Sequence, residues 1–166
     1  MLAYGILMAG CGLGSFTIVI FGFNSGNLGV NCNTAYSPSC EPVFRARSTC
    51  YSTITWIFLL LAWELIDFRR SFFAMPDGPR AWALHLWGNK FLFFSVTLAF
   101  VVVFPTLYIP GLNRVVFLHE GISWEWAVVF IAVAAYLMLT EAWKWAKRVY
   151  FRRTASRTQR RWEDKV

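Results

Sequence analysis

The stretch F-L-F-F-S-V-T-L-A-F-V-V-V-F-P-T-L-Y-I, Phe91 to Ile109, carries no charged side chain. A helix of about 20 residues crosses a hydrocarbon layer of roughly 30 Å, so this stretch is long enough to span a membrane. Backbone groups in lipid must be hydrogen-bonded within the protein, which leaves only helices and closed β-barrels. The alternating pattern of a barrel strand is absent from this stretch. It therefore predicts a membrane-spanning helix.

Three other runs of the chain are similarly apolar and long. With 57% hydrophobic and 15% charged residues among 166, the chain has more apolar surface than a soluble core of this size can bury. The sequence thus predicts an all-α membrane protein rather than buried helices of a soluble domain. Its four spanning helices are expected within residues 1–153, at about 3–23, 49–66, 91–109 and 124–148, with a basic tail over 154–166.

The positive charges are concentrated on one predicted side of the membrane. Of 16 Lys and Arg residues, 13 lie between Arg69 and Lys90 or between Lys144 and Lys165. Cytoplasmic loops carry such an excess, so both termini are predicted to be cytoplasmic, with Arg45, Arg47 and Arg114 on the outer side. A nucleic-acid binder spreads its cations over a face instead, so no nucleic-acid partner is expected despite the net charge of +7.

Aromatic and charged residues near the helix ends are predicted to anchor the protein at the membrane borders, because indole rings favour the headgroup level and cations favour anionic lipid. The expected partner of this belt is the lipid bilayer. The predicted anchors are Trp124 and Trp126 on the outer side, and Glu141, Trp143, Lys144, Trp145, Lys147 and Arg148 on the inner side.

The run A-G-C-G-L-G, Ala9 to Gly14, lacks the spacing of a phosphate-binding glycine loop. Gly10 and Gly14 instead form a G-x-x-x-G pattern, which lets a neighbouring helix approach closely. The alternative, a lipoprotein signal ending at Cys11, requires a positively charged start that Met1 to Tyr4 does not have. We therefore predict helix packing at the two glycines.

Cys32 and Cys40 share a loop on the predicted outer side, where the compartment is oxidising. The residues themselves allow either a disulfide or two free thiols. The only histidines, His85 and His119, are placed on opposite sides of the membrane. No metal site is therefore predicted.

Acids and hydroxyls within the predicted spans are possible sites of ion transport, since a charge in lipid costs several kcal/mol. Each acid lies near a helix end, which favours border anchoring. The hydroxyls of the second span could line an ion path or bond to neighbouring helices. We take Thr55 and Glu64 as the ion-path candidates; the other residues of these two groups are Ser48, Thr49, Ser52, Thr53, Asp67, Glu125 and Glu141.

Five segments resemble the C-terminal membrane end of P-type cation ATPases, most closely the fungal sodium-exporting (type IID) pumps. They are V-F-R-A-R-S-T-C-Y-S-T-I-T-W (Val43 to Trp56), L-A-W-E-L-I-D-F-R-R-S-F-F-A-M (Leu61 to Met75), F-P-T-L-Y-I-P-G-L-N (Phe104 to Asn113), H-E-G-I-S-W-E-W (His119 to Trp126) and E-A-W-K-W-A-K-R-V-Y-F-R-R (Glu141 to Arg153). Together they cover most of residues 43–153 in the family's order.

The resemblance implies that the four helices correspond to the family's seventh to tenth, in the same orientation as the Lys/Arg count gives. Related calcium pumps have a disulfide in the loop before the eighth helix, which favours a Cys32–Cys40 bridge. Those pumps also carry an acidic ion ligand midway along that helix, where this chain has Phe58. Glu64 lies about 9 Å further along a helix rising 1.5 Å per residue, so that ligand is not transferred.

The family's phosphorylation motif D-K-T-G-T and its T-G-E-S motif are both missing from these residues. The resembled pump uses ATP and Mg²⁺, but we predict no catalytic, cofactor-binding or metal-binding residue in this chain. The hypothesis is a C-terminal membrane module of a plasma-membrane pump, present as a fragment, that supports sodium or potassium export by packing and anchoring against the remaining helices. The alternative is a free-standing four-helix regulator of a pump.

Overall fold

The computed structural model describes residues 2–26, 28–33, 36–64 and 87–163. This part of the chain is helical, without strands. Its elements are α1 (Leu2–Thr17), η1 (Ile18–Phe23), η2 (Pro38–Cys40), α2 (Glu41–Glu64), α4 (Lys90–Tyr108), η4 (Leu112–Phe117) and α5 (Glu125–Glu163).

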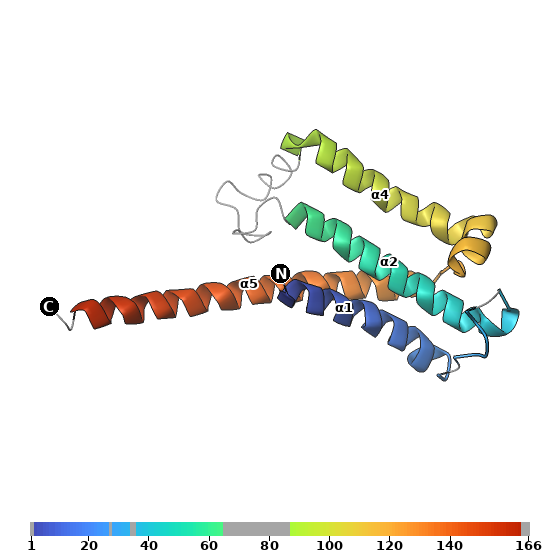
Figure 1. Cartoon of the computed structure of the whole chain (residues 1–166), viewed down its shortest axis with the longest axis horizontal. Helices are drawn as coiled ribbons and strands as arrows, with labels where there is room; N and C mark the ends of the chain where they lie inside the picture. Colours follow the sequence, from blue (N-terminus) through green and yellow to red (C-terminus); the bar gives the residue numbers. More distant parts are fainter. Residues whose placement is uncertain (1, 27, 34–35, 65–86, 164–166) are drawn as a thin grey trace.

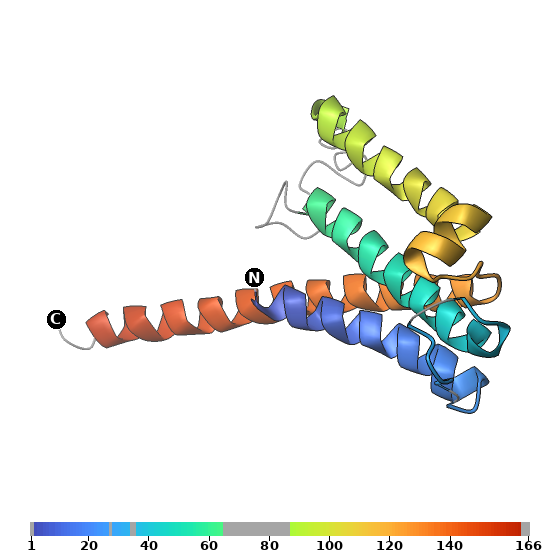
Figure 2. The same ribbon diagram turned by 45° about the vertical axis from the view of Figure 1, so that its right-hand side comes forward.

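The long helices run alongside one another, with α2 in contact with α1, α4 and α5 (Figure 1). One end of the bundle, here called the loop end, holds η1, η2, η4 and the described residues around them, 18–26, 28–33, 36–48 and 109–126. At the opposite tail end, α5 continues well past the other helices (Figure 2). The first residues of α1 and the far end of α5 point to this same side of the bundle (Figure 1).

Three of the described helical stretches are long and apolar enough to cross a membrane: Leu2–Phe23, Lys90–Tyr108 and Glu125–Arg152. Only 22% of the residues in the most apolar part of each are buried, so their apolar side chains mostly face outward. An apolar surface of this extent is typical of a protein embedded in lipid or packed on further helices. The prediction of an all-helical membrane protein is therefore confirmed in its class, whereas a fourth span at 49–66 stays a prediction.

Two helices of the structure extend beyond the membrane spans predicted for them. α2 begins at Glu41 rather than near residue 49, because an acid and Pro42 in its first turn are good helix-starting residues even though this turn is polar. α5 continues as one helix to Glu163, because the residues predicted as a tail contain several strong helix formers and no Gly or Pro. The predicted end of the second span at Ile66 and the basic loop before Trp87 lie outside the described residues.

Buried apolar side chains form two clusters. The first joins η1 and the Cys32–Cys40 loop to the start of α2, and its members are Val19, Ile20, Cys32, Cys40, Val43, Phe44 and Ala46. The second joins the middle of α2 to α4 and α5, and its members are Ile57, Val103, Leu107, Ile122, Val129, Val133 and Tyr136. α2 contributes to both clusters, so it is the central helix of the bundle.

Gly12 allows α1 to approach α2 closely. A Cβ added to this residue would lie 2.6 Å from Ile54 Cγ1, a distance at which either the Ile54 side chain or one of the helices has to shift. A Cβ added to Gly10 or Gly14 would meet no atom within 4 Å in the described residues. The close contact within this bundle is thus made by Gly12, and the face of α1 that carries Gly10 and Gly14 is open.

Candidate functional site at the loop end

The segment before α2 is held by a covalent bridge between Cys32 and Cys40, whose Cα atoms are 5.6 Å apart. Both cysteines are buried in the first apolar cluster. Gly29, with φ of +63°, lies beside the bridge, and a Cβ there would be 2.4 Å from Cys32 Sγ. The structure thus contains the pairing that the resemblance favoured, and Cys11 and Cys50 are free thiols.

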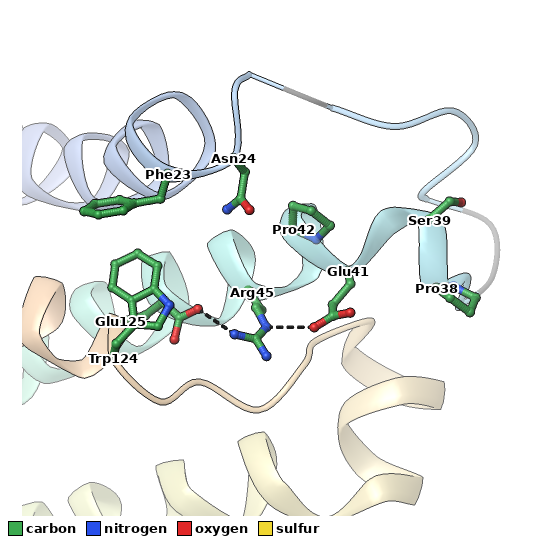
Figure 3. A pocket seen from close by; sticks show the side chains of 9 residues that line it. All are labelled: Phe23, Asn24, Pro38, Ser39, Glu41, Pro42, Arg45, Trp124 and Glu125. Atoms are coloured by element: carbon green, nitrogen blue, oxygen red, sulfur yellow. Dashed lines mark hydrogen bonds and ion pairs between the residues drawn. The ribbon is translucent and has the colours of Figure 1, made fainter.

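Arg45 joins the start of α2 to the start of α5 (Figure 3). Its Nη1 lies 3.1 Å from Glu125 Oε1, and its Nε lies 3.1 Å from Glu41 Oε1. Glu125 is 1% exposed, and its second oxygen accepts a hydrogen bond from Ser123 N–H at 2.8 Å. A buried carboxylate is tolerated only when it is paired and hydrogen-bonded. Arg45 therefore supplies the charge that allows Glu125 to be buried at the N-terminus of α5.

A pocket of about 610 Å³ opens beside this ion pair. Phe23 and Trp124 form one wall, with ring centroids 4.3 Å apart, while Arg45 and the two carboxylates form another (Figure 3). Trp124 is 41% exposed, as a side chain at the headgroup level is expected to be. This pocket thus has one aromatic wall and one charged wall.

The connection from α4 to α5 is fastened onto α2 by Ser48. Its hydroxyl lies 2.6 Å from the Glu120 carbonyl oxygen and accepts a hydrogen bond from Glu120 N–H at 3.1 Å. The Glu120 carboxylate binds Arg114 at 3.1 Å. Burial would raise the pKa of Glu120, but hydrogen bonds from Tyr36 and Arg114 keep this pKa below its usual value. The α4–α5 connection is therefore fixed to α2 by polar contacts.

The other hydroxyls of α2 are satisfied largely within the helix. Thr49 and Ser52 donate to the carbonyl oxygens four residues earlier, at 2.9 Å and 2.8 Å. Thr53 is fully buried, and its hydroxyl has no hydrogen-bond partner in the described part. Among the described contacts of these hydroxyls, Ser48 bonds outside α2, and its partner is a loop rather than a neighbouring helix.

A second pocket, of about 330 Å³, lies beside the outer half of α2 and is here called the Arg47 pocket. His119 lines it from the α4–α5 connection, is 7% exposed, and has no hydrogen-bond partner for Nδ1 in the described residues. Burial, and secondarily the charge of Arg47, lower the pKa of His119 below its ordinary value. The predicted ion-path residue Thr55 is half-buried in this pocket, whose lining is Phe16, Arg47, Cys50, Tyr51, Ile54, Thr55 and His119.

The remaining predicted site residues are spread over the molecule. Trp126 donates from Nε1 to the Tyr108 hydroxyl at 2.8 Å, and at the tail end Glu141 pairs with Lys144 at 3.2 Å. Glu64 is the last residue of α2, and its side chain is outside the described set. The other predicted anchors, Trp143, Trp145, Lys147 and Arg148, are exposed on α5.

Sequence reasoning did not identify the pairing of Arg45 with Glu125. The sequence did contain a hint of this pairing, because Arg45 and Arg47 lie on the outer side, where the charge rule disfavours cations. Cations at such positions are expected to have acidic partners nearby. Among the residues the structure describes, no group of three His, Cys, Asp or Glu side chains is placed to hold a metal ion. The chemistry of this end is thus ion pairing and hydrogen bonding.

Comparison with known proteins gives matches over nearly the whole chain. The family model described as "Cation transporting ATPase, C-terminus" matches residues 1–146. Sodium/potassium exporting P-type ATPase 1 of Saccharomyces cerevisiae is 45% identical over 154 residues, which cover 90% of this chain and 14% of that protein. Sodium/potassium exporting P-type ATPase cta3 of Schizosaccharomyces pombe is 39% identical over 172 residues, covering 95% of the chain and 17% of the relative. None of the solved structures matches the chain.

Proposed function

The chain belongs to the family of the C-terminal region of cation-transporting ATPases, and from this premise we propose that it forms the last four membrane helices of a cation-exporting P-type pump. The observation that carries this proposal is the family match over residues 1–146, which includes all of α1, α2 and α4 and the apolar half of α5. Because the relatives above are named sodium/potassium exporters, sodium and potassium are the proposed ions.

We propose that α2 is the fourth membrane-spanning helix, beside the three apolar ones. Its charged first turns are compatible with a membrane border, because Arg45 is neutralised by Glu41 and Glu125. An even number of spans puts both termini on one side, and the 13 Lys and Arg residues of the sequence segments 69–90 and 144–165 favour the cytoplasm for that side. The proposed location is the plasma membrane.

The proposed role is to support the ion-carrying helices of the pump by packing and anchoring. The outward apolar faces of α1, α4 and α5 are suited to further helices and to lipid. The open face with Gly10 and Gly14 is proposed as the place where a helix of the remaining pump approaches α1. ATP and Mg²⁺ would act in the remainder of the pump.

Co-purification followed by an ATPase assay tests this proposal. The tagged chain is purified from membranes in mild detergent, and cation-stimulated ATP hydrolysis is measured in the purified material and in the chain alone. We expect activity only in the complex. Isolation of the chain without any pump would contradict the proposal, and a complex with a pump that already has its own C-terminal helices would favour a regulator.

The packing face is tested with matched glycine variants. Gly14→Leu is expected to reduce the amount of co-purified pump, because the larger side chain keeps a partner helix away from α1. Gly5→Leu is the control, since a Cβ at Gly5 also meets no atom within 4 Å but this residue is outside the G-x-x-x-G pattern. Equal recovery with both variants would remove the proposed contact.

A further inference from the structure

Arg47 differs from the other arginines at the loop end in its partners. Arg45 lies against two carboxylates and Arg114 against Glu120. The Arg47 guanidinium instead donates to neutral oxygens, the Cys32 carbonyl at 3.3 Å and the Asn33 side chain. Within the residues that the structure describes, no carboxylate forms an ion pair with Arg47. In this part of the chain its positive charge therefore has no anionic partner, and Arg47 lies near the proposed membrane border.

The Arg47 pocket also contains a polar atom without a hydrogen-bond partner in the described residues, Nδ1 of the His119 ring. This ring is packed against Tyr51 and Phe117, with centroids 5.2 Å and 5.7 Å away. His119 is 7% exposed, and Nδ1 makes no hydrogen bond in the described part of the chain. A buried nitrogen in this state favours a ligand that completes its hydrogen bonding.

The remainder of the pocket wall is largely apolar and extends away from Arg47 along α2. Phe16 comes from α1, and Ile54 follows Arg47 on the same side of α2. Arg47 and Thr55 are about 12 Å apart along the helix axis at 1.5 Å per residue. Phe58, one turn beyond Ile54, is 60% exposed and continues this apolar surface.

A cation at the proposed membrane border, next to an imidazole whose Nδ1 has no partner in the described residues and to a largely apolar pocket wall, matches the form of a phospholipid. We propose that the Arg47 pocket binds one phospholipid of the leaflet at the loop end. The phosphate contacts Arg47 and His119, and the upper part of one acyl chain lies against Phe16 and Ile54. Arginine suits this role because its planar group binds phosphate oxygens in pairs. The inference rests on the proposed membrane embedding, but not on the presence of a pump.

Cys50 provides a direct probe, because it is a free thiol that lines the pocket. The full chain with Cys11→Ala is delipidated in detergent, and the rate of alkylation of Cys50 is followed by mass spectrometry. Only unoccupied protein reacts, so short-chain phosphatidylcholine at ten times its Kd is expected to slow the reaction about tenfold. Diacylglycerol, which lacks the phosphate, and inorganic phosphate, which lacks the chains, are expected to leave the rate unchanged.

Variants locate the phosphate contact. Arg47→Gln is expected to abolish the protection, while Arg148→Gln, the same charge change on exposed α5, is expected to retain it. If circular dichroism shows that Arg47→Gln does not fold, Arg47→Lys serves in its place, with protection weakened but still present because the charge remains. Full protection in Arg47→Gln, or unaltered protection in Arg47→Lys, would overturn the assigned contact.

Other occupants give different results. Absence of protection by phosphatidylcholine in the parent protein overturns the proposal. Equal protection by diacylglycerol removes the phosphate contact, and protection by inorganic phosphate alone indicates a free anion. Protection of Cys50 in a lipid-free complex with a pump shows that a protein segment occupies the pocket. Because the assay uses the purified chain, failure to isolate a pump does not affect it.

Discussion

At the loop end, a disulfide, a buried ion pair and the Ser48 contacts tie the connecting segments onto α2, whereas at the tail end α5 extends past the other described helices (Figure 1). The loop end is held by contacts within the chain itself. The exposed cations Lys147 and Arg148 on the extended part of α5 are placed to interact with groups outside the chain, such as lipid headgroups. Stability is therefore expected to depend strongly on the loop end and weakly on the tail.

The largest effect is expected from Arg45→Met, which leaves the Glu125 carboxylate buried without its cation. Removal of one partner of a buried ion pair costs about 3 to 5 kcal/mol, and the partial exposure of Arg45 favours the lower value. The free energy of unfolding in detergent, followed by tryptophan fluorescence, measures the loss.

Glu41→Gln is the control for this variant, since Glu41 is half exposed and surface pairs contribute about 0 to 1 kcal/mol. The double variant Arg45→Met/Glu125→Met is expected to recover most of the loss, because the uncompensated charge is gone. Equal destabilisation by Arg45→Met and Glu41→Gln would show that the buried pair is not the main link.

Removal of the disulfide by Cys32→Ser/Cys40→Ser is expected to destabilise the loop end by about 2 to 3 kcal/mol, because a short loop is released in the unfolded chain. The same unfolding measurement applies. Cys50→Ser is the control, since it removes a free thiol. If reducing agent lowers the stability of the parent protein and of the double serine variant equally, the bridge is not responsible.

Gly12→Leu is expected to cost about 1 to 3 kcal/mol, as overpacked cores do, because its side chain would collide with Ile54. Gly10→Leu is the matched change on the open face of α1 and is expected to be neutral or slightly stabilising, since leucine favours helices more than glycine does. Chemical unfolding compares the two. The reverse order would place the α1–α2 contact at Gly10.

A smaller effect is expected from pH. The lowered pKa of His119, caused first by burial and then by Arg47, means that the unfolded chain binds its proton more readily. The stability contributed by neutral His119 is complete above its ordinary pKa of 6.5 and is lost as the pH falls below that value. Unfolding between pH 7.5 and about pH 5 measures this slope. His119→Gln is expected to reduce it, and an unchanged slope would assign it to other groups.

The smallest effect is expected at the tail end. Arg148 is exposed on α5, so Arg148→Gln is expected to change the free energy of unfolding by less than about 0.5 kcal/mol. If Arg148→Gln lowered the free energy of unfolding as much as Arg45→Met, the tail end would contribute as much to stability as the loop end. The proposed difference between the two ends would then be wrong.

The sequence predicted the apolar helices well. The predicted spans at 3–23 and 91–109 lie within or over the helical stretch Leu2–Phe23 and α4, because long uncharged runs have few other stable states in lipid. The start of α2 was missed because its first turns are polar and do not look like a membrane span. α5 extends beyond the predicted span at 124–148. The change to polar residues was taken as the end of the span, but these residues still have high helix propensity.

The contacts of the candidate site were harder to predict from the sequence, because they join segments that are far apart along the chain. Arg45 and Glu125 are 80 residues apart, and Ser48 and Glu120 are 72 apart. Local patterns suggested that cations on the outer side need partners, but not which carboxylates they would meet.

The sequence by itself determined that this chain is helical, apolar and suited to a membrane, because charge poverty over about 20 residues leaves few alternatives. The tertiary structure decided how the helices are rotated against one another. That rotation selects Gly12 rather than Gly10 or Gly14 for the contact with α2, and it buries Glu125 beside Arg45. Periodicity gives each helix its faces, but only packing of side chains from several helices chooses which faces meet.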